Sequence, residues 1–208
     1  MHLRVVTIRN ESGIGKEIGE VLKGMSGAVP NIIKSMEGLQ GLTVTADLEH
    51  GVIENVFFWK SAADMVANSP LNENQVDAEG RPVPHLYEMI DGWQVVEVLQ
   101  EAMVDLAKAP ALGNVTHVQR IALLTGRIDE YVAYLKSEVI PRCKAVGGFL
   151  GVRLAADIGR ICGLAIVYLY WEDEAAMTTG VMQEKMHEAE AAAHGARVLE
   201  ETFRQVYA

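Results

Sequence analysis

Hydrophobic residues occur at two different spacings along the chain, and the two spacings predict a mixture of strands and helices. Short runs rich in β-branched and aromatic residues, such as 162–171, are typical of buried strands. In contrast, Ile128, Val132, Leu135 and Val139 recur at steps of three or four residues, as they do on one face of a helix. Elements of both kinds alternate along the whole chain.

The second half of the chain predicts the order strand, helix, strand, strand, helix, strand. Asp129 and Glu130 lie in the first turn of its first helix, where the helix dipole favours negative charge. Pro141 and the pair Gly147-Gly148 mark the expected end of that helix. Its second helix begins near Glu172 and could continue, with a break, to about Glu200. The expected strands are 115–125, 149–155, 162–171 and 202–207.

The first half predicts the same order of elements. Its helices are expected at 15–36 and 62–68, and its strands at 3–8, 39–45, 52–59 and 93–100. Both halves therefore have the order βαββαβ, which is that of the ferredoxin-like unit.

An internal repeat accompanies this shared order. Gly38–Asp47 aligns with Gly148–Asp157, with both glycines and the closing Ala-Asp matched, at an offset of 110 residues (Gly38 to Gly148). Val56–Met65 aligns with Tyr168–Met177 at an offset of 112 residues (Val56 to Tyr168). The two-residue difference falls between the blocks, where a turn could absorb it. We interpret the two halves as a tandem duplication.

A four-stranded sheet of this kind carries helices on one face only, so its other face needs a second cover. The other half of the same chain could supply it. We therefore predict an α+β fold in which two tandem ferredoxin-like units form an intramolecular dimeric α/β barrel. The predicted domains are 1–110, with an inserted loop at 68–92, and 111–208.

Composition and charge narrow the function classes. The chain has 28 acidic and 18 basic residues, a formal net charge of −10, which would repel a nucleic acid. No apolar run approaches the roughly 18 residues of a membrane span, and the start of the chain leads directly into an expected strand. We therefore expect a cytoplasmic protein that binds a small molecule, neither nucleic acid nor membrane, and that could form a homo-oligomer.

Aromatic residues in the strand 162–171 are the first candidates for a binding site. Alternation places Tyr168 and Tyr170 on one face and Trp171 on the other. The tyrosine hydroxyls suit a cavity with polar contacts, and Trp171 could contact substrate or anchor a helix. Which face lines a cavity is left open by the sequence, and packing in the core is the alternative role for each residue.

Histidines are the second group of candidates. His117 shares a strand face with Gln119, and it could act as a general base because its pKa is ordinarily near neutral pH; a position at the solvated start of the strand is the alternative. His187, on an expected helix, could be an acid or base or a haem ligand, or simply a surface residue. In the Pro- and Asn-rich loop 68–92, His85 and Tyr87 could contact substrate.

Two short motifs resemble the antibiotic-biosynthesis-monooxygenase group of dimeric α/β-barrel proteins. They are Gly-Phe-Leu-Gly-Val-Arg-Leu at 148–154 and Tyr-Leu-Tyr-Trp-Glu-Asp-Glu-Ala at 168–175, with weaker versions at 38–41 and 58–63. That group includes cofactor-independent oxygenases of aromatic polyketides or quinols, haem-degrading enzymes and proteins without known activity. The resemblance supports the fold more strongly than a function.

The resemblance implies three functions in turn. The first is a monooxygenase-like enzyme that acts on a small aromatic or apolar substrate without a tightly bound metal, with His117 as base and Tyr168 and Tyr170 as substrate contacts. The second is a non-catalytic small-ligand-binding or stress-type protein, and the third is a haem-binding protein. No cofactor is expected, although haem or flavin could serve. Haem degradation is not expected, because Asn68 and Gly180 stand where that branch has its catalytic tryptophan.

Overall fold

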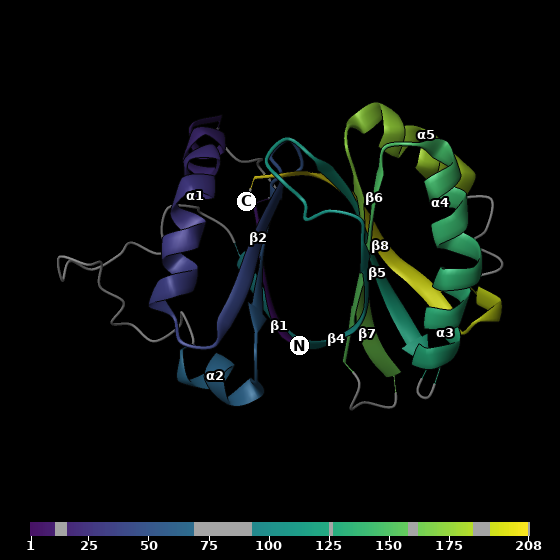
Figure 1. Cartoon of the computed structure of the whole chain (residues 1–208), viewed down its shortest axis with the longest axis horizontal. Coiled ribbons are helices and arrows are strands. Elements are labelled where there is room, and N and C mark those ends of the chain that lie inside the picture. The colour runs from purple at the N-terminus through teal and green to yellow at the C-terminus, as the bar shows by residue number, and fades with distance from the viewer. Residues whose placement is uncertain (11–15, 69–92, 125–126, 158–161, 185–191, 208) are drawn as a thin grey trace. The chain divides into compact units, whose positions relative to one another are not determined.

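The chain groups into two units, Met1–Val98 and Leu99–Tyr207, which Figure 1 shows with their own helices and strands. A computed structural model describes residues 1–10, 16–68, 93–124, 127–157, 162–184 and 192–207. The division falls inside the strand β4 (Trp93–Leu106), because the second part of β4 pairs with a strand of unit 2. The predicted boundary after residue 110 concerns the repeat and stays a prediction.

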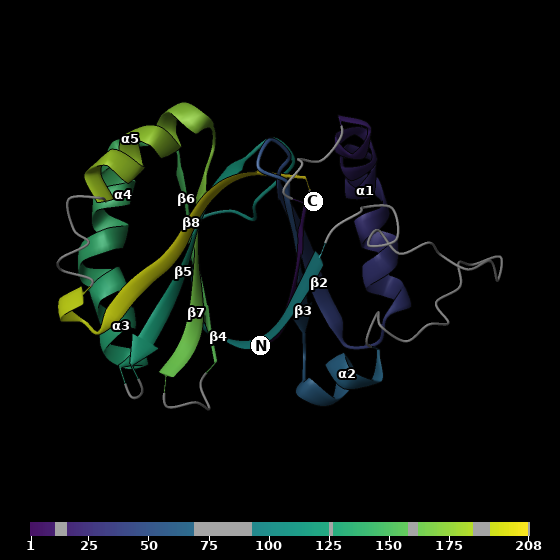
Figure 2. The same cartoon turned by 180° about the vertical axis from the view of Figure 1, so that it is seen from behind.

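Unit 1 has a sheet in which β3 is the middle strand and pairs antiparallel with both β1 and β2. The helix α1 covers one face of this sheet in both views (Figures 1 and 2). Every residue of β3 is buried, as its nearly continuous apolar sequence predicts. The elements are β1 (His2–Arg9), α1 (Lys16–Ser35), β2 (Leu39–Asp47), β3 (Val52–Trp59) and α2 (Ala62–Ala67).

Unit 2 has a sheet in the order β8-β5-β7-β6, all antiparallel, with the second part of β4 beside β6. Its helices lie together on one side of this sheet (Figure 2). The elements are β5 (Val115–Leu124), α3 (Ile128–Tyr134), the π-helical turn η2 (Leu135–Val139), α4 (Ile140–Val146), β6 (Phe149–Ala156), β7 (Cys162–Trp171), α5 (Glu174–Glu184) and β8 (Ala196–Val206). The predicted ferredoxin-like α+β fold is confirmed.

The two repeated sequence blocks have the same local structure in the two units. In unit 1 Leu39 pairs with Trp59, and the strand register then shifts so that Gly41 pairs with Phe58. Unit 2 repeats this pattern, with Phe149 opposite Trp171 and Gly151 opposite Tyr170 after the same shift. The matched motifs therefore mark equivalent β-bulges. The duplication itself, and the pairing of the units in one barrel, stay predictions.

The first helical segment of unit 2 ends just before the pair Gly147-Gly148, as predicted, but Pro141 lies inside it and does not mark its end. Pro141 is the second residue of α4, which continues to Val146. The five residues before α4 form the π-helical turn η2, whose hydrogen bonds reach back five residues instead of four. Such a turn changes the backbone where a proline ring would otherwise meet the carbonyl of the residue four positions earlier.

The second helical prediction for unit 2 extends too far toward the C-terminus. We expected helix, with a break, to about Glu200, but the strand β8 already begins at Ala196. Ala196 and Val198 pack against the core of unit 2, so apolar burial in this segment follows the strand period and pairing with β5 overrides the helix-forming composition. Among the described helices, none combines the length and apolar character that a membrane crossing requires.

Candidate functional site

Strand pairing divides the side chains of unit 2 between two faces of its sheet. Val167, Leu169 and Trp171 pack in one core with residues of α3, α4 and α5, and they define the helix face. Tyr168 and Tyr170 lie on the opposite face, as predicted from strand alternation. We call this opposite face the tyrosine face. Its members relevant to ligand binding are Glu101, Thr116, Arg120, Arg153, Tyr168, Tyr170, Glu200, Thr202 and Arg204.

The rings of Tyr168 and Tyr170 form the largest aromatic feature of the tyrosine face. They are stacked, with ring centroids 6.2 Å apart and an angle of 11° between their planes. Both side chains are buried. Two nearly parallel rings, each with a phenolic hydroxyl, offer an apolar surface with polar groups at its edge, which suits a planar aromatic ligand that carries oxygen atoms.

Four arginines share this face with the tyrosines; Arg197, the partner of Ala122, is exposed, and the other three lie closer to the tyrosine pair in the register. Arg153 of β6 is the cross-strand partner of Tyr168, and Arg120 of β5 is the partner of Ile166, one position diagonal to Tyr168. Arg204 of β8 is the partner of Thr116, which in turn pairs with Tyr170. Guanidinium groups therefore lie on both neighbouring strands of the tyrosine pair.

Two carboxylates hold two of these arginines. Arg153 Nε lies 3.6 Å from Glu101 Oε2, and Arg120 Nε lies 3.5 Å from Glu200 Oε2. Both distances exceed the roughly 2.7–2.9 Å of a strong charge-assisted hydrogen bond. The pairs orient the guanidinium groups.

Thr116 adds a buried hydroxyl at the Tyr170 end of the face. It is 0% exposed, and its Oγ1 has no hydrogen-bond partner among the residues that the structure describes. A buried hydroxyl without a partner is destabilising by about 1–3 kcal/mol. Its position opposite Tyr170 makes it a candidate contact for a polar atom of a ligand.

His117 lies on the other face of the sheet from the two tyrosines. It is the cross-strand partner of Leu169, it is buried, and its ring stacks on Phe203 with centroids 4.9 Å apart. Its Nε2 lies 3.5 Å from Glu201 Oε1, which also accepts a 3.0 Å hydrogen bond from Gln119 Nε2. A substrate on the tyrosine face would therefore have the whole sheet between it and the predicted base.

Trp171 is part of the helix-face core. Its indole is 0% exposed and packs on Phe149 at a centroid distance of 4.8 Å. A Cβ atom added to Gly180 would lie 2.1 Å from Trp171 Cη2, so only glycine leaves room for this indole. The position at which the haem-degrading branch would need its tryptophan is thus filled by Trp171 itself. The predicted substrate contact of Trp171 stays a prediction.

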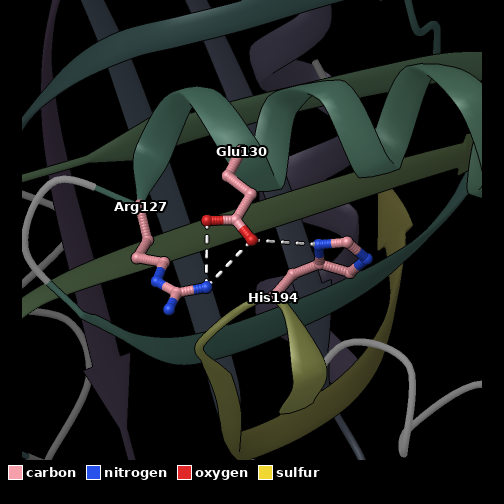
Figure 3. Close-up of polar contacts among 3 residues, drawn as sticks. All are labelled: Arg127, Glu130 and His194. Carbon is pink, nitrogen blue, oxygen red and sulfur yellow. Dashed lines mark hydrogen bonds and ion pairs between the residues drawn. The ribbon is translucent and has the colours of Figure 1, made fainter.

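Figure 3 shows a second polar cluster in unit 2, formed by Arg127, Glu130 and His194. Arg127 Nη1 lies 2.9 Å from both carboxylate oxygens of Glu130, and His194 Nδ1 lies 3.6 Å from Glu130 Oε1. His194 also stacks on Tyr134, with centroids 4.6 Å apart. The cluster joins the start of α3 to the turn before β8, and its half-exposed charges indicate a structural role.

Three predicted site residues lie outside the described part of the chain. They are His85 and Tyr87 of the inserted loop and His187 after α5. Their predicted roles stay predictions. Asn68, at the start of that loop, caps the end of α2, where its Nδ2 donates to the carbonyl oxygens of Asp64 and Glu37, each at 3.1 Å.

The sequence did not reveal the arginine cluster, because its members come from three strands far apart in the chain. The available signal was a charged residue at alternating positions of otherwise apolar strands. Combining that signal across strands requires the register, which the structure supplies.

Comparison with known proteins supports the fold. No protein-family model and no curated protein matches the sequence. Among solved structures, an anthrone oxidase-like protein has a TM-score of 0.65 at 16% identity and matches 99% of this chain and 91% of its own. A candidate monooxygenase from Lactobacillus acidophilus has a TM-score of 0.63 at 10% identity, over 99% of this chain and 92% of its own.

A haem-binding protein from Thermus thermophilus is also similar, with a TM-score of 0.51 at 11% identity over 98% of this chain and 90% of its own. All three similarities extend over nearly the full length of both chains. At these identities they establish a shared fold and no shared activity.

Proposed function

We propose that the chain binds a small aromatic substrate on the tyrosine face of unit 2 and oxygenates it without a tightly bound metal. The stacked pair of Tyr168 and Tyr170 carries this proposal, because it offers ring surface and hydroxyl groups on a face that also holds arginines. The fold shared with an anthrone oxidase-like protein and a candidate monooxygenase is consistent with it.

The proposed reaction draws its electrons from the substrate. A ring-activated CH2 group loses a proton, and the resulting carbanion transfers electrons to O2. A carbon–oxygen bond forms, and loss of water then leaves a carbonyl, so that CH2 and O2 become C=O and H2O. The protein has to exclude water, orient the ring and stabilise the anion.

The tyrosine face can supply these functions from its own residues. Tyr168 and Tyr170 orient the ring, and the guanidinium groups stabilise negative charge on the substrate oxygen. The carboxylates on this face, Glu101 and Glu200, are the candidate proton acceptors. The earlier candidate, His117, could act only on a substrate that binds at the helix face.

Oxygen uptake by the full chain with anthrones, whose CH2 group lies between two aromatic rings, tests the proposal. We expect turnover that falls at least tenfold in Tyr168→Leu and Tyr170→Leu, because both lose ring surface, and that is better preserved in the matched variants Tyr168→Phe and Tyr170→Phe. Absence of oxygen uptake with every substrate of this class would refute the oxygenase function.

His117→Gln separates the two faces. If the tyrosine face is the site, this variant keeps the turnover of the native chain. If turnover is lost in His117→Gln while the folded state is retained, and both Tyr→Leu variants remain active, the site is on the helix face and the assignment of Tyr168 and Tyr170 is wrong.

Two other functions have distinct results in the same experiments. A non-catalytic ligand-binding protein would bind the aromatic compounds without oxygen uptake. A haem-binding protein would shift the Soret band on titration with haem, and His187 would be the first residue to replace. The fold of the Thermus thermophilus protein makes the haem titration worthwhile.

A further inference from the structure

The charges around Tyr168 indicate which chemical form of a ligand the tyrosine face would hold. Directly opposed residues on antiparallel strands have Cβ atoms about 5 Å apart, and diagonal ones about 7–8 Å. Arg153 is directly opposite Tyr168 and Arg120 is diagonal to it on the other side. A ligand stacked on the Tyr168 ring would therefore have a guanidinium group on each flank.

Positive charges outnumber negative ones on this face. The described strands place four guanidinium groups and two carboxylates there, although the chain as a whole has a formal net charge of −10. Arg197 is exposed at the start of β8, and the other charged side chains are buried or half-buried. They are Glu101, Arg120, Arg153, Arg197, Glu200 and Arg204.

Burial makes these charges effective. Arg120 is 8% exposed and Arg204 is 2% exposed. Coulombic interactions weaken with the dielectric constant, so a guanidinium group removed from water acts on a nearby anion several times more strongly than one in solvent. Arginine is also the cation that is least costly to keep in such a place, because its charge is delocalised and weakly hydrated.

We infer that the ligand of the tyrosine face is an aromatic acid, a phenol or enol, that binds as its anion between the guanidinium groups of Arg153 and Arg120. This inference rests on the proposed function only for the location of the site. Its proton leaves to solvent when the ligand binds. For an enol, this anion is the same species as the carbanion that loss of the CH2 proton gives, with its charge drawn on oxygen, and it is the electron-rich form that reacts with O2.

The hydroxyl of Thr116 fixes the other end of such a ligand. Thr116 is opposite Tyr170, which lies two residues along β7 from Tyr168 on the same face. Its Oγ1 is buried without a partner among the described residues. A hydroxyl can donate to a second oxygen on the ring. The face is thus built for a planar ligand with oxygen atoms at both ends, one of them ionised.

The test uses 4-nitrophenol as the probe and the full chain as the protein. The phenolate absorbs visible light and the phenol does not, so one titration gives both binding and ionisation. We expect the phenolate to bind at least about tenfold more tightly than the phenol, which lowers the ionisation midpoint of the bound probe by about one pH unit. 4-Nitroanisole, with the same ring but no acidic proton, should bind at least about tenfold more weakly than the phenolate.

Substitutions of the arginines show which of them cause the shift in the ionisation midpoint. Arg153→Gln and Arg120→Gln should each reduce the shift of the midpoint, and the double variant should abolish it. Arg153→Lys should retain most of it, because the charge remains. Arg142→Gln is the matched control, since it removes a guanidinium of α4 that pairs with Glu138 of η2, and it should leave the midpoint unchanged. Thermal melts confirm that each variant is folded.

Equal affinity for the phenol and the phenolate would overturn the inference, as would failure of the probe to bind or an unchanged midpoint in the folded double variant. The oxygenase proposal fails separately. A chain that binds phenolate through Arg153 and Arg120 but never consumes O2 keeps the anion site and loses the reaction. A chain that consumes O2 but binds phenol and phenolate equally keeps the reaction and loses the anion site.

Discussion

The contact between Gly180 and Trp171 permits a quantitative prediction. Alanine at position 180 would place its Cβ 2.1 Å from Trp171 Cη2 and 2.5 Å from Cζ2. Trp171 is 0% exposed in a packed core, so the indole cannot move aside without displacing its neighbours. Overpacking of this kind destabilises a protein by about 1–3 kcal/mol.

A matched control removes the effect of helix propensity. Gly180 lies inside α5 and Gly27 inside α1, and a Cβ at Gly27 would meet no atom within 4 Å. Alanine is favoured over glycine by about 1 kcal/mol in a helix interior. Gly27→Ala should therefore stabilise the chain. Gly180→Ala should change the free energy of unfolding by the cost of the clash minus the gain in helix propensity. The difference between the variants, about 1–3 kcal/mol, measures the clash.

Urea and thermal unfolding, followed by far-ultraviolet circular dichroism, measure both variants. At this chain length a change of 1 kcal/mol in the free energy of unfolding shifts Tm by about 2–4 °C. Replacing the indole by a smaller ring in Gly180→Ala/Trp171→Phe should recover part of the loss relative to Trp171→Phe alone, with a coupling energy of about 1–2 kcal/mol. If Gly180→Ala stabilised the chain as much as Gly27→Ala, the packing argument would be refuted, and with it the reason why a tryptophan is excluded at position 180.

Three further predictions concern other features. Gly151→Ala should destabilise unit 2 by more than about 2 kcal/mol, because its Cβ would lie 2.2 Å from the Asp105 carbonyl oxygen at a φ of +138°; a urea midpoint equal to that of the native chain would contradict this. Glu130→Gln should cost no more than about 1 kcal/mol, and the difference should shrink in high salt; a larger, salt-independent loss in urea titrations would show that the cluster in Figure 3 is more than a surface network. A hydrogen bond from the His50 ring to the Asp47 carboxylate raises the pKa of His50, so Asp47→Asn should lower that pKa in an NMR titration. Any stability from this pair is complete at pH values below the ordinary histidine pKa and is lost as the pH rises through the raised pKa; an unchanged histidine titration would show that the carboxylate is not the cause.

The strands were the part of the fold most accessible to sequence reasoning. Val52–Trp59 and Cys162–Trp171 have the bounds expected from their apolar runs, because burial on both faces leaves an unbroken signal. The alternation of Tyr168, Tyr170 and Trp171 was also correct. These features depend on one segment at a time, and local periodicity determines them.

Features that depend on several segments were harder to predict. We expected Pro141 to mark a helix end, but it lies inside the helical segment. We expected helix to about Glu200, but β8 begins at Ala196, because pairing with β5 outweighs local propensity. The relation of His117 to the tyrosines required the pairing of β5 with β7. Sequence alone placed each side chain on one of two faces of its own strand. It did not show which face of one strand lies on the same side of the sheet as a given face of the next strand.

The composition of the tyrosine face is itself an argument for a ligand. Replacing a buried ion pair by apolar residues of similar volume is often neutral or stabilising, and strand interiors favour β-branched and aromatic residues. The pairs Arg153–Glu101 and Arg120–Glu200, and the buried hydroxyl of Thr116, are therefore poor choices for stability alone. They are good choices for a surface that must hold an anion, since departures from the most stable sequence are expected at functional sites. The helix face of the same sheet, with its core of aliphatic residues around Trp171, shows what the chain uses where only packing is required.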